Sequence, residues 1–249
     1  MPDHYLFYLY GGDQPWSSEV WETSDDRVRG GSSQSYLRVV NPERARFTGH
    51  LDTKTLGGAG FASQHSRGVL DLDLSDYDGI LVSVVDADDK RYAITLKDQL
   101  PRGRRPDGRE KAAVSWEADF TAKHADGDMT GAPVQIFLPW SAFKPTYRGR
   151  DKGNVKPLDL TSIKRVGLMM RSFFGQQDGD FSIDIHAVAA RRPMPDPAAV
   201  QQPTTRSVGS PQDEEEDEEE EDEDVKKNPV TPPQSRGSTW WRKLLCGLV

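Results

Sequence analysis

Cysteine is almost absent from this chain, which has a single one, Cys246, in 249 residues. One thiol excludes an internal disulfide and a zinc site of the paired-cysteine type, and it favours a reducing compartment. No serine lies in a G-x-S-x-G turn, and Cys246 has no partner base near it in the sequence. Nucleophilic catalysis therefore has no support, and we expect no catalytic residue and no enzymatic activity.

Long apolar runs and an N-terminal positive charge are also missing. No stretch is long and apolar enough to span a bilayer, and the first basic residue is Arg27. The start of the chain therefore matches neither a signal peptide nor an arginine-rich transit peptide, and we expect a soluble protein.

Metal-ligand spacing is not found either. The five histidines, His4, His50, His65, His124 and His186, lie in separate segments. The aspartates between Asp71 and Asp89 match no defined calcium loop, and turn chemistry accounts for them. We predict no metal and no cofactor.

Charge is distributed very unevenly along the chain. Residues 213–224 form an unbroken run of 12 acidic residues, without which 32 basic residues face 28 acidic ones and the net charge changes from -8 to +4. The mildly basic body and strongly acidic tail do not fit a nucleic-acid-binding protein. Residues 193–249 are poor in apolar side chains, so we expect a disordered tail.

The tail ends in a short sequence that regains apolar character. Trp240 and Trp241 precede Arg242 and Lys243, a combination that suits peripheral contact with a membrane or a partner. Cys246 is fourth from the end, as in a prenylation box, but Gly247 is not aliphatic. Lipidation is therefore an open alternative at this position.

The most ordered pattern lies between residues 70 and 96. Ile80–Val85 is apolar on both faces, which predicts a central strand, whereas Arg91–Leu96 alternates polar and apolar residues as a half-buried strand does. The acidic connection Asp86–Lys90 has turn chemistry. We therefore predict that the two strands pair as an antiparallel hairpin.

Similar alternation recurs through the first three-quarters of the chain. A second hairpin is predicted around Asn41-Pro42, and a strand with Trp116 facing the core follows the central pair. In the last strand, Asp184 and His186 are expected on the solvent side. About nine strands and no convincing helix predict an all-β domain over residues 1–192, an antiparallel β-sandwich or jelly roll, with the disordered tail in residues 193–249.

The glycine cluster Gly57–Gly60 is reminiscent of a dinucleotide fingerprint but leads into a segment without helical periodicity. A nucleotide-binding loop must open a helix, so we interpret these glycines as a bulge or a close backbone approach.

Basic loops offer candidate partner-binding residues. Two polar loops are rich in arginine, and Trp140 follows a proline at the end of a strand, where an aromatic ring is expected to be exposed. The candidate residues are Arg102, Arg104, Arg105, Arg109, Trp140, Arg148 and Arg150.

Several short segments, in this order, carry a resemblance to a known family. They are Asp26–Ser35 (DRVRGGSSQS), Phe47–Gly49, Gly58–Ser63 (GAGFAS), Leu74–Ile80 (LSDYDGI), Lys90–Tyr92, Pro139–Phe143 (PWSAF) and Ile163–Met169. The set resembles the complex I intermediate-associated protein family, assembly factors of about thirty kilodaltons for mitochondrial NADH:ubiquinone oxidoreductase.

The resemblance implies a jelly roll similar to galactose-binding domains, no catalysis, and a chaperone-like role in which a protein client, a complex I assembly intermediate, is bound. It also implies mitochondrial residence, with the cytoplasm as the alternative because no presequence is recognisable. Two other functions remain open on the residues alone: a carbohydrate-binding module that stacks sugar on Trp140, and a domain associated with an NAD(P)-dependent reductase.

Overall fold

The computed structural model describes residues 5–103, 105–106, 110–122 and 132–193. Contacts within the chain divide it into Met1–Gln201 and Gln202–Val249, and all described residues belong to the first unit. The predicted disordered tail, Trp240–Lys243 and Cys246 lie outside the described part. Within that part all regular structure is β-strand or short 3-10 helix, which confirms the all-β prediction.

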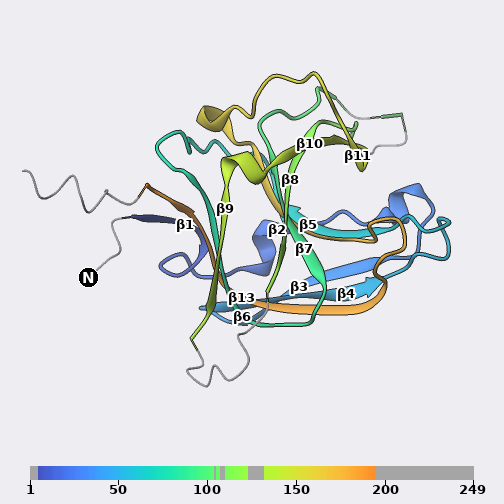
Figure 1. Ribbon diagram of the computed structural model, residues 1–249, viewed down its shortest axis with the longest axis horizontal. Helices are drawn as coiled ribbons and strands as arrows, with labels where there is room; N and C mark the ends of the chain where they lie inside the picture. Colours follow the sequence, from blue (N-terminus) through green and yellow to red (C-terminus); the bar gives the residue numbers. More distant parts are fainter. Residues whose placement is uncertain (1–4, 104, 107–109, 123–131, 194–249) are drawn as a thin grey trace, which may run out of the picture. The chain divides into compact units, whose positions relative to one another are not determined.

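Two antiparallel sheets face each other (Figure 1). Sheet A has the order β3-β4-β13-β6-β9, and β1 pairs with the far end of β13. The hairpin predicted around Asn41-Pro42 is confirmed as β3–β4. The bounds are β1 (Leu6–Gly11), β3 (Gln34–Asn41), β4 (Arg44–Leu51), β6 (Gly79–Ala87), β9 (Val134–Pro139) and β13 (Gly179–Arg191).

Sheet B has the order β11-β10-β8-β7-β12-β5-β2. Its bounds are β2 (Trp21–Thr23), β5 (Phe61–Ser66), β7 (Arg91–Lys97), β8 (Ser115–Thr121), β10 (Lys144–Tyr147), β11 (Arg150–Asp151) and β12 (Arg165–Arg171). The 3-10 helices are η1 (Ser18–Val20), η2 (Asp26–Arg29), η3 (Trp140–Ala142) and η4 (Leu160–Ser162). No helix among the described residues is long and apolar enough to cross a membrane.

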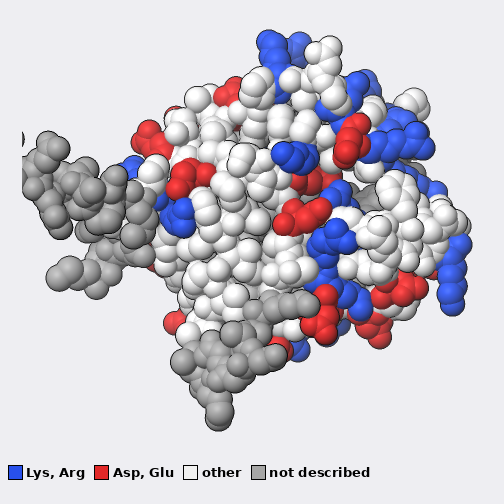
Figure 2. Space-filling view, viewed as in Figure 1, with Lys and Arg blue, Asp and Glu red and all other residues white. Residues whose placement is uncertain are grey.

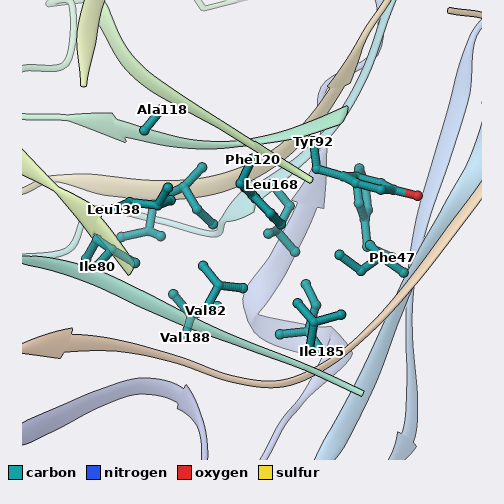
Figure 3. Close-up of a cluster of buried hydrophobic side chains, with 14 of the residues drawn as sticks. Phe47, Ile80, Val82, Tyr92, Ala118, Phe120, Leu138, Leu168, Ile185 and Val188 are labelled. Atoms are coloured by element: carbon teal, nitrogen blue, oxygen red, sulfur yellow. The ribbon is translucent and has the colours of Figure 1, made fainter. Parts of the chain in front are cut away.

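The core lies between the inner faces of the two sheets (Figure 3). Ile80, Val82 and Ile185 reach it from sheet A, whereas Tyr92 and Leu168 reach it from sheet B. All of these side chains are almost completely buried. Burial of each large apolar side chain contributes about 1.5–3 kcal/mol, so this layer is the main source of stability. Trp116 is buried as its strand phase predicts.

The prediction that residues 80–85 and 91–96 form a hairpin is wrong. β6 pairs with β13 and β9 in sheet A, whereas β7 pairs with β12 and β8 in sheet B. The connection crosses between sheets because Asp88 fixes both ends of it: its carboxylate accepts hydrogen bonds from the backbone N–H of Ser182 in β13 and from the Tyr92 hydroxyl in β7. Each strand is therefore central in its own sheet.

Two adjacent buried carboxylates join β3 to β5. Asp25 accepts hydrogen bonds from the backbone N–H groups of Ser35 and Ser63, at 3.0 and 2.9 Å. Asp26, which has no exposed surface, accepts from the backbone N–H groups of Ser33 and Phe61. Since the donors come from two segments that share no ladder, the Asp25–Asp26 pair fixes the chain where η2 enters the sheets. This is a structural role for the Asp26–Ser35 motif.

The prediction that Asp184 faces solvent is also wrong. Asp184 is 3 % exposed, and its carboxylate accepts two hydrogen bonds from the Arg46 guanidinium, at 2.5 and 2.8 Å. A bidentate ion pair of this kind compensates the negative charge of the buried carboxylate.

Candidate interaction site

The basic residues singled out from the sequence lie at one end of sheet B. Arg102 and Arg105 are exposed in the β7–β8 connection, and Arg148 and Arg150 are exposed in the β10–β11 hairpin. Because β8 and β10 are antiparallel with Ser115 opposite Thr146, both segments leave the sheet at the same end. Figure 2 shows Lys and Arg side chains gathered around β10 and β11. Arg104 and Arg109 lie outside the described residues.

Trp140 is not the exposed platform that its position after Pro139 predicted. It is half-buried against the core, its indole Nε1 donates a hydrogen bond to the Tyr77 carbonyl oxygen at 2.5 Å, and its ring contacts Phe143 at 5.7 Å between centroids. A ring held in this way stabilises the end of β9 and leaves little free face for a sugar.

The outer face of sheet B, which turns away from the core, carries a dense set of ionisable side chains. We call it the charged face and define it by His65, Lys97, Glu110, Glu117, Asp119, Arg165 and Arg171. The strand alternation of β5, β7, β8 and β12 places all of them except Glu110 on this side, and Glu110 reaches it from the β7–β8 connection.

Two arginines of β12 organise the charged face. Arg165 binds both carboxylate oxygens of Glu110, at 2.6 and 3.1 Å. Arg171 binds Glu117 at 2.7 Å and both oxygens of Asp119 at 2.7 and 2.6 Å. The other oxygen of Glu117 accepts the Thr146 hydroxyl at 2.5 Å. The bonds of Arg171 therefore connect β12, β8 and β10 in one network of charge-assisted hydrogen bonds, and the Arg165–Glu110 pair ties the β7–β8 connection to β12.

The pKa values on this face are shifted in opposite directions. Burial raises the pKa of Glu117 above its ordinary value, although the Thr146 hydroxyl and Arg171 oppose the shift. Burial lowers the pKa of His65 and of Lys97, and neighbouring Arg165 lowers both further. The hydrogen bonds from Arg165 lower the pKa of Glu110. Such gathered perturbations are typical of functional sites, although structural ion pairs also produce them.

Sheet B curves toward its outer side. The Arg29 guanidinium lies 3.5 Å from the Arg148 carbonyl oxygen and 5.3 Å from the centre of the Phe61 ring. In a flat sheet β11 and β5 would stand about 24 Å apart, since neighbouring strands are about 4.8 Å apart. One arginine reaches both, so the hairpin and η2 approach each other across the charged face.

The glycine cluster forms a turn ahead of β5 rather than a bulge, and the expected close backbone approach is found at Gly60, where a Cβ atom would lie 2.3 Å from the Asp52 carbonyl oxygen. Gly57 and Gly58 have positive φ angles of 60° and 93°, and the segment leads into strand β5 rather than into a helix. Gly58 lies beside the turn that contains Phe174. This geometry lacks the helix N-terminus that holds a pyrophosphate. Among the described residues, no three of His, Cys, Asp and Glu are grouped in a way that could hold a metal ion.

A second candidate is a shallow hollow of about 450 Å³ on the outer side of sheet A, where Tyr36, Arg38 and Asp180 contribute to its lining. Two of its polar side chains already have partners beside the hollow. Asp180 lies 2.7 Å from the His50 ring nitrogen, and the Tyr36 hydroxyl donates to Gln34. The hollow therefore offers fewer unused groups to a ligand than the charged face does.

Sequence reasoning missed the charged face. The run from Ile163 to Met170 is mostly apolar and gives little sign of a polar face, although Arg165 lies within it and Arg171 follows it. Strand phase alone could have placed Lys97, Glu117 and Arg171 on one side of their strands. It could not have shown that three strands bring these residues together, because that depends on the order of strands in the sheet.

Solved structures resemble this fold. The family 11 carbohydrate-binding module of the cellulase Lic26A-Cel5E from Clostridium thermocellum matches with a TM-score of 0.50 and 13% identity, covering 75% of this chain and 94% of that one. The same type of module in complex with a mixed-linked tetrasaccharide matches with a TM-score of 0.48 and 14% identity over 76% and 95% of the two chains. At such identities the first likeness supports the β-sandwich fold alone.

Sequence comparisons are more specific. An uncharacterized protein of Schizosaccharomyces pombe is 37% identical over 191 residues, which cover 74% of this chain and 84% of that protein. Residues 11–185 match the family described as complex I intermediate-associated protein 30. That match spans both sheets and the Asp26–Ser35 motif, so the chain belongs to the complex I intermediate-associated protein 30 family.

Proposed function

We propose that the protein is a non-enzymatic assembly factor that binds an intermediate of mitochondrial respiratory complex I and holds it, as a chaperone does, until assembly proceeds. The family match over residues 11–185 carries this proposal, since the family is described by its association with such intermediates. The same family match supports our proposal that the protein resides in mitochondria.

The client is a protein, and the surface that we assign to it is the basic end of sheet B together with the charged face. Of the basic candidates, Arg102, Arg105, Arg148 and Arg150 lie in the segments at this end, while Arg104 and Arg109 are outside the described residues. We call the exposed basic residues around β10 and β11 the basic rim. Such a rim beside the ion pairs of the charged face attracts an acidic client and favours it over clients of other charge. Trp140 supports the end of β9 in this proposal and does not contact the client.

Deletion of the gene in its native cell, followed by native-gel analysis of respiratory complexes, tests the proposal. We expect loss of mature complex I and accumulation of a partial complex, with recovery when the wild-type chain is supplied again. Cell fractionation should place the tagged chain in mitochondria. Unaltered complex I assembly in the deletion strain would refute the function.

A further inference from the structure

We propose that the charged face and the neighbouring Phe173–Gly175 turn bind an extended acidic segment of a partner protein, with an apolar side chain that packs on Phe174. This inference rests on the proposed function and specifies the chemistry of the client. Three observations support it. Two arginine side chains of β12 have nitrogen atoms without a hydrogen-bond partner, an aromatic side chain is exposed on a strained turn, and basic residues surround β10 and β11.

The unused donors are the Nε atoms of Arg165 and Arg171. Both are buried and have no hydrogen-bond partner among the described residues, while their terminal nitrogens bind carboxylates. Arg165 itself is only 5 % exposed. Because native proteins leave few buried donors unpaired, we infer that a small rotation of each guanidinium group lets an acceptor from another molecule complete its hydrogen bonds. The two residues are six positions apart on one strand, about 20 Å at 3.3 Å per residue, which suits an extended segment.

The turn that follows β12 presents an apolar anchor. Phe173, Phe174 and Gly175 have consecutive positive φ angles of 46°, 59° and 85°, a conformation that costs free energy for residues other than glycine. Phe173 lies between two guanidinium groups, 3.7 Å from that of Arg91 and 4.5 Å from that of Arg171. Phe174 is 83 % exposed.

Gln177 holds this turn in place. Its side-chain amide donates to the carbonyl oxygens of Arg91 and Arg171 at 2.8 Å, and its oxygen accepts from the Arg91 backbone N–H at 3.0 Å. The backbone that carries the exposed phenylalanine is therefore held in place before a partner arrives. Fixed aromatic anchors lose little entropy on binding and are common among the residues that dominate interface energies.

The positive charge of the basic rim indicates that the partner segment is acidic. The exposed residues Arg102, Arg105, Arg148, Arg150, Lys152 and Lys156 lie in the segments around β10 and β11. Figure 2 shows Lys and Arg side chains gathered around these two strands. Carboxylates on an extended segment would complement both this rim and the unused arginine donors.

Fluorescence anisotropy with labelled twelve-residue peptides tests the inference on the full chain. The probe peptide contains glutamate, serine and one central leucine. Comparison probes replace the glutamates by lysine or the leucine by serine, and a twelve-nucleotide thymidine strand represents nucleic acid. We expect saturable binding of the acidic leucine peptide, about tenfold weaker binding after Phe174→Ser or after Arg148→Glu with Arg150→Glu, and weaker binding of every other probe.

Tyr36→Ser is the matched control variant, since Tyr36 is also an exposed aromatic residue but lies on sheet A, and it should leave binding unchanged. Equal binding of the lysine peptide, tighter binding of the nucleic acid, or unchanged affinity of the Phe174→Ser variant would overturn the inference. These outcomes are separate from the proposed function: a complex I defect in the deletion strain without acidic-peptide binding would reject the inference and keep the function.

Discussion

The carboxylate of Asp26 accepts two hydrogen bonds from Ser33, one from its backbone N–H at 3.0 Å and one from its hydroxyl at 2.6 Å. A third comes from the Phe61 backbone N–H at 3.1 Å. The same arrangement recurs in an exposed turn, where Asp73 accepts from the backbone N–H and hydroxyl of Ser75 at 3.0 and 2.6 Å. The two sites share the pair of serine bonds but differ in burial and in the bond from Phe61, so comparing them shows what the buried bonds between segments add to stability.

We predict that Asp26→Ala lowers the free energy of unfolding by about 2 kcal/mol or more, because it leaves the backbone N–H groups of Ser33 and Phe61 without a partner and each costs about 1–3 kcal/mol. Asp73→Ala should cost less than about 1 kcal/mol, since water replaces its carboxylate. Urea denaturation of both variants measures the difference. Similar losses in the two variants would show that the Asp25–Asp26 pair does not hold β3 to β5.

Gly49 is required by the close approach of β3 and β4. A Cβ atom at this position would lie 2.0 Å from the Gln34 carbonyl oxygen and 2.8 Å from the Phe181 ring. We expect Gly49→Ala to destabilise the fold by about 1–3 kcal/mol, as overpacking does. Gly153→Ala is the control, since a Cβ there meets no atom within 4 Å. Equal melting temperatures of the two variants would contradict the close packing.

Lys97 should lower stability at neutral pH. Burial, and then neighbouring Arg165, lowers its pKa, so the folded state disfavours the protonated amine. The stability linked to a lowered lysine pKa is present above the unfolded value of 10.5 and is lost as pH falls through the folded pKa. Lys97→Met should therefore raise the melting temperature at pH 7 by about 2–4 °C, and by less near pH 10.

Differential scanning calorimetry at both pH values provides the measurement. Lys54→Met, at an exposed position, is the control and should change little at either pH. A melting temperature for Lys97→Met that stays at or below the wild-type value at pH 7 would mean that the amine stabilises the charged face.

The sequence predicted the sandwich because strand alternation is local information. Ile80 and Tyr92 were both placed in strands, and both are buried in the core. Which strand pairs with which is not local information. A short polar connection such as Asp86–Lys90 suits a hairpin and a crossing between sheets equally well, and the Asp88 bond to Ser182 that decides between them spans 94 residues.

The candidate site was predictable only in part for the same reason. Exposed arginines in polar loops were recognisable from composition, and Arg102, Arg105, Arg148 and Arg150 are indeed exposed. The buried state of Asp184 depends on Arg46, which is 138 residues away. The Arg171–Glu117 pair spans 54 residues. Alternation assigns a side to each such residue but cannot identify its partner.

The crossing between the sheets can be tested at Tyr92, whose buried hydroxyl donates to Asp88 at 2.8 Å. Tyr92→Phe removes one donor to a carboxylate that also accepts from the backbone N–H groups of Lys90 and Ser182. We expect a loss of about 1.5–3 kcal/mol in unfolding free energy, the usual range for a hydrogen bond to a charged group. Tyr36→Phe removes an exposed hydroxyl that donates to Gln34 at 2.9 Å and should cost less than about 0.5 kcal/mol. Guanidinium unfolding followed by tryptophan fluorescence compares the two, and if Tyr92→Phe were as stable as Tyr36→Phe, the Asp88 bonds would not be what directs the chain from sheet A to sheet B.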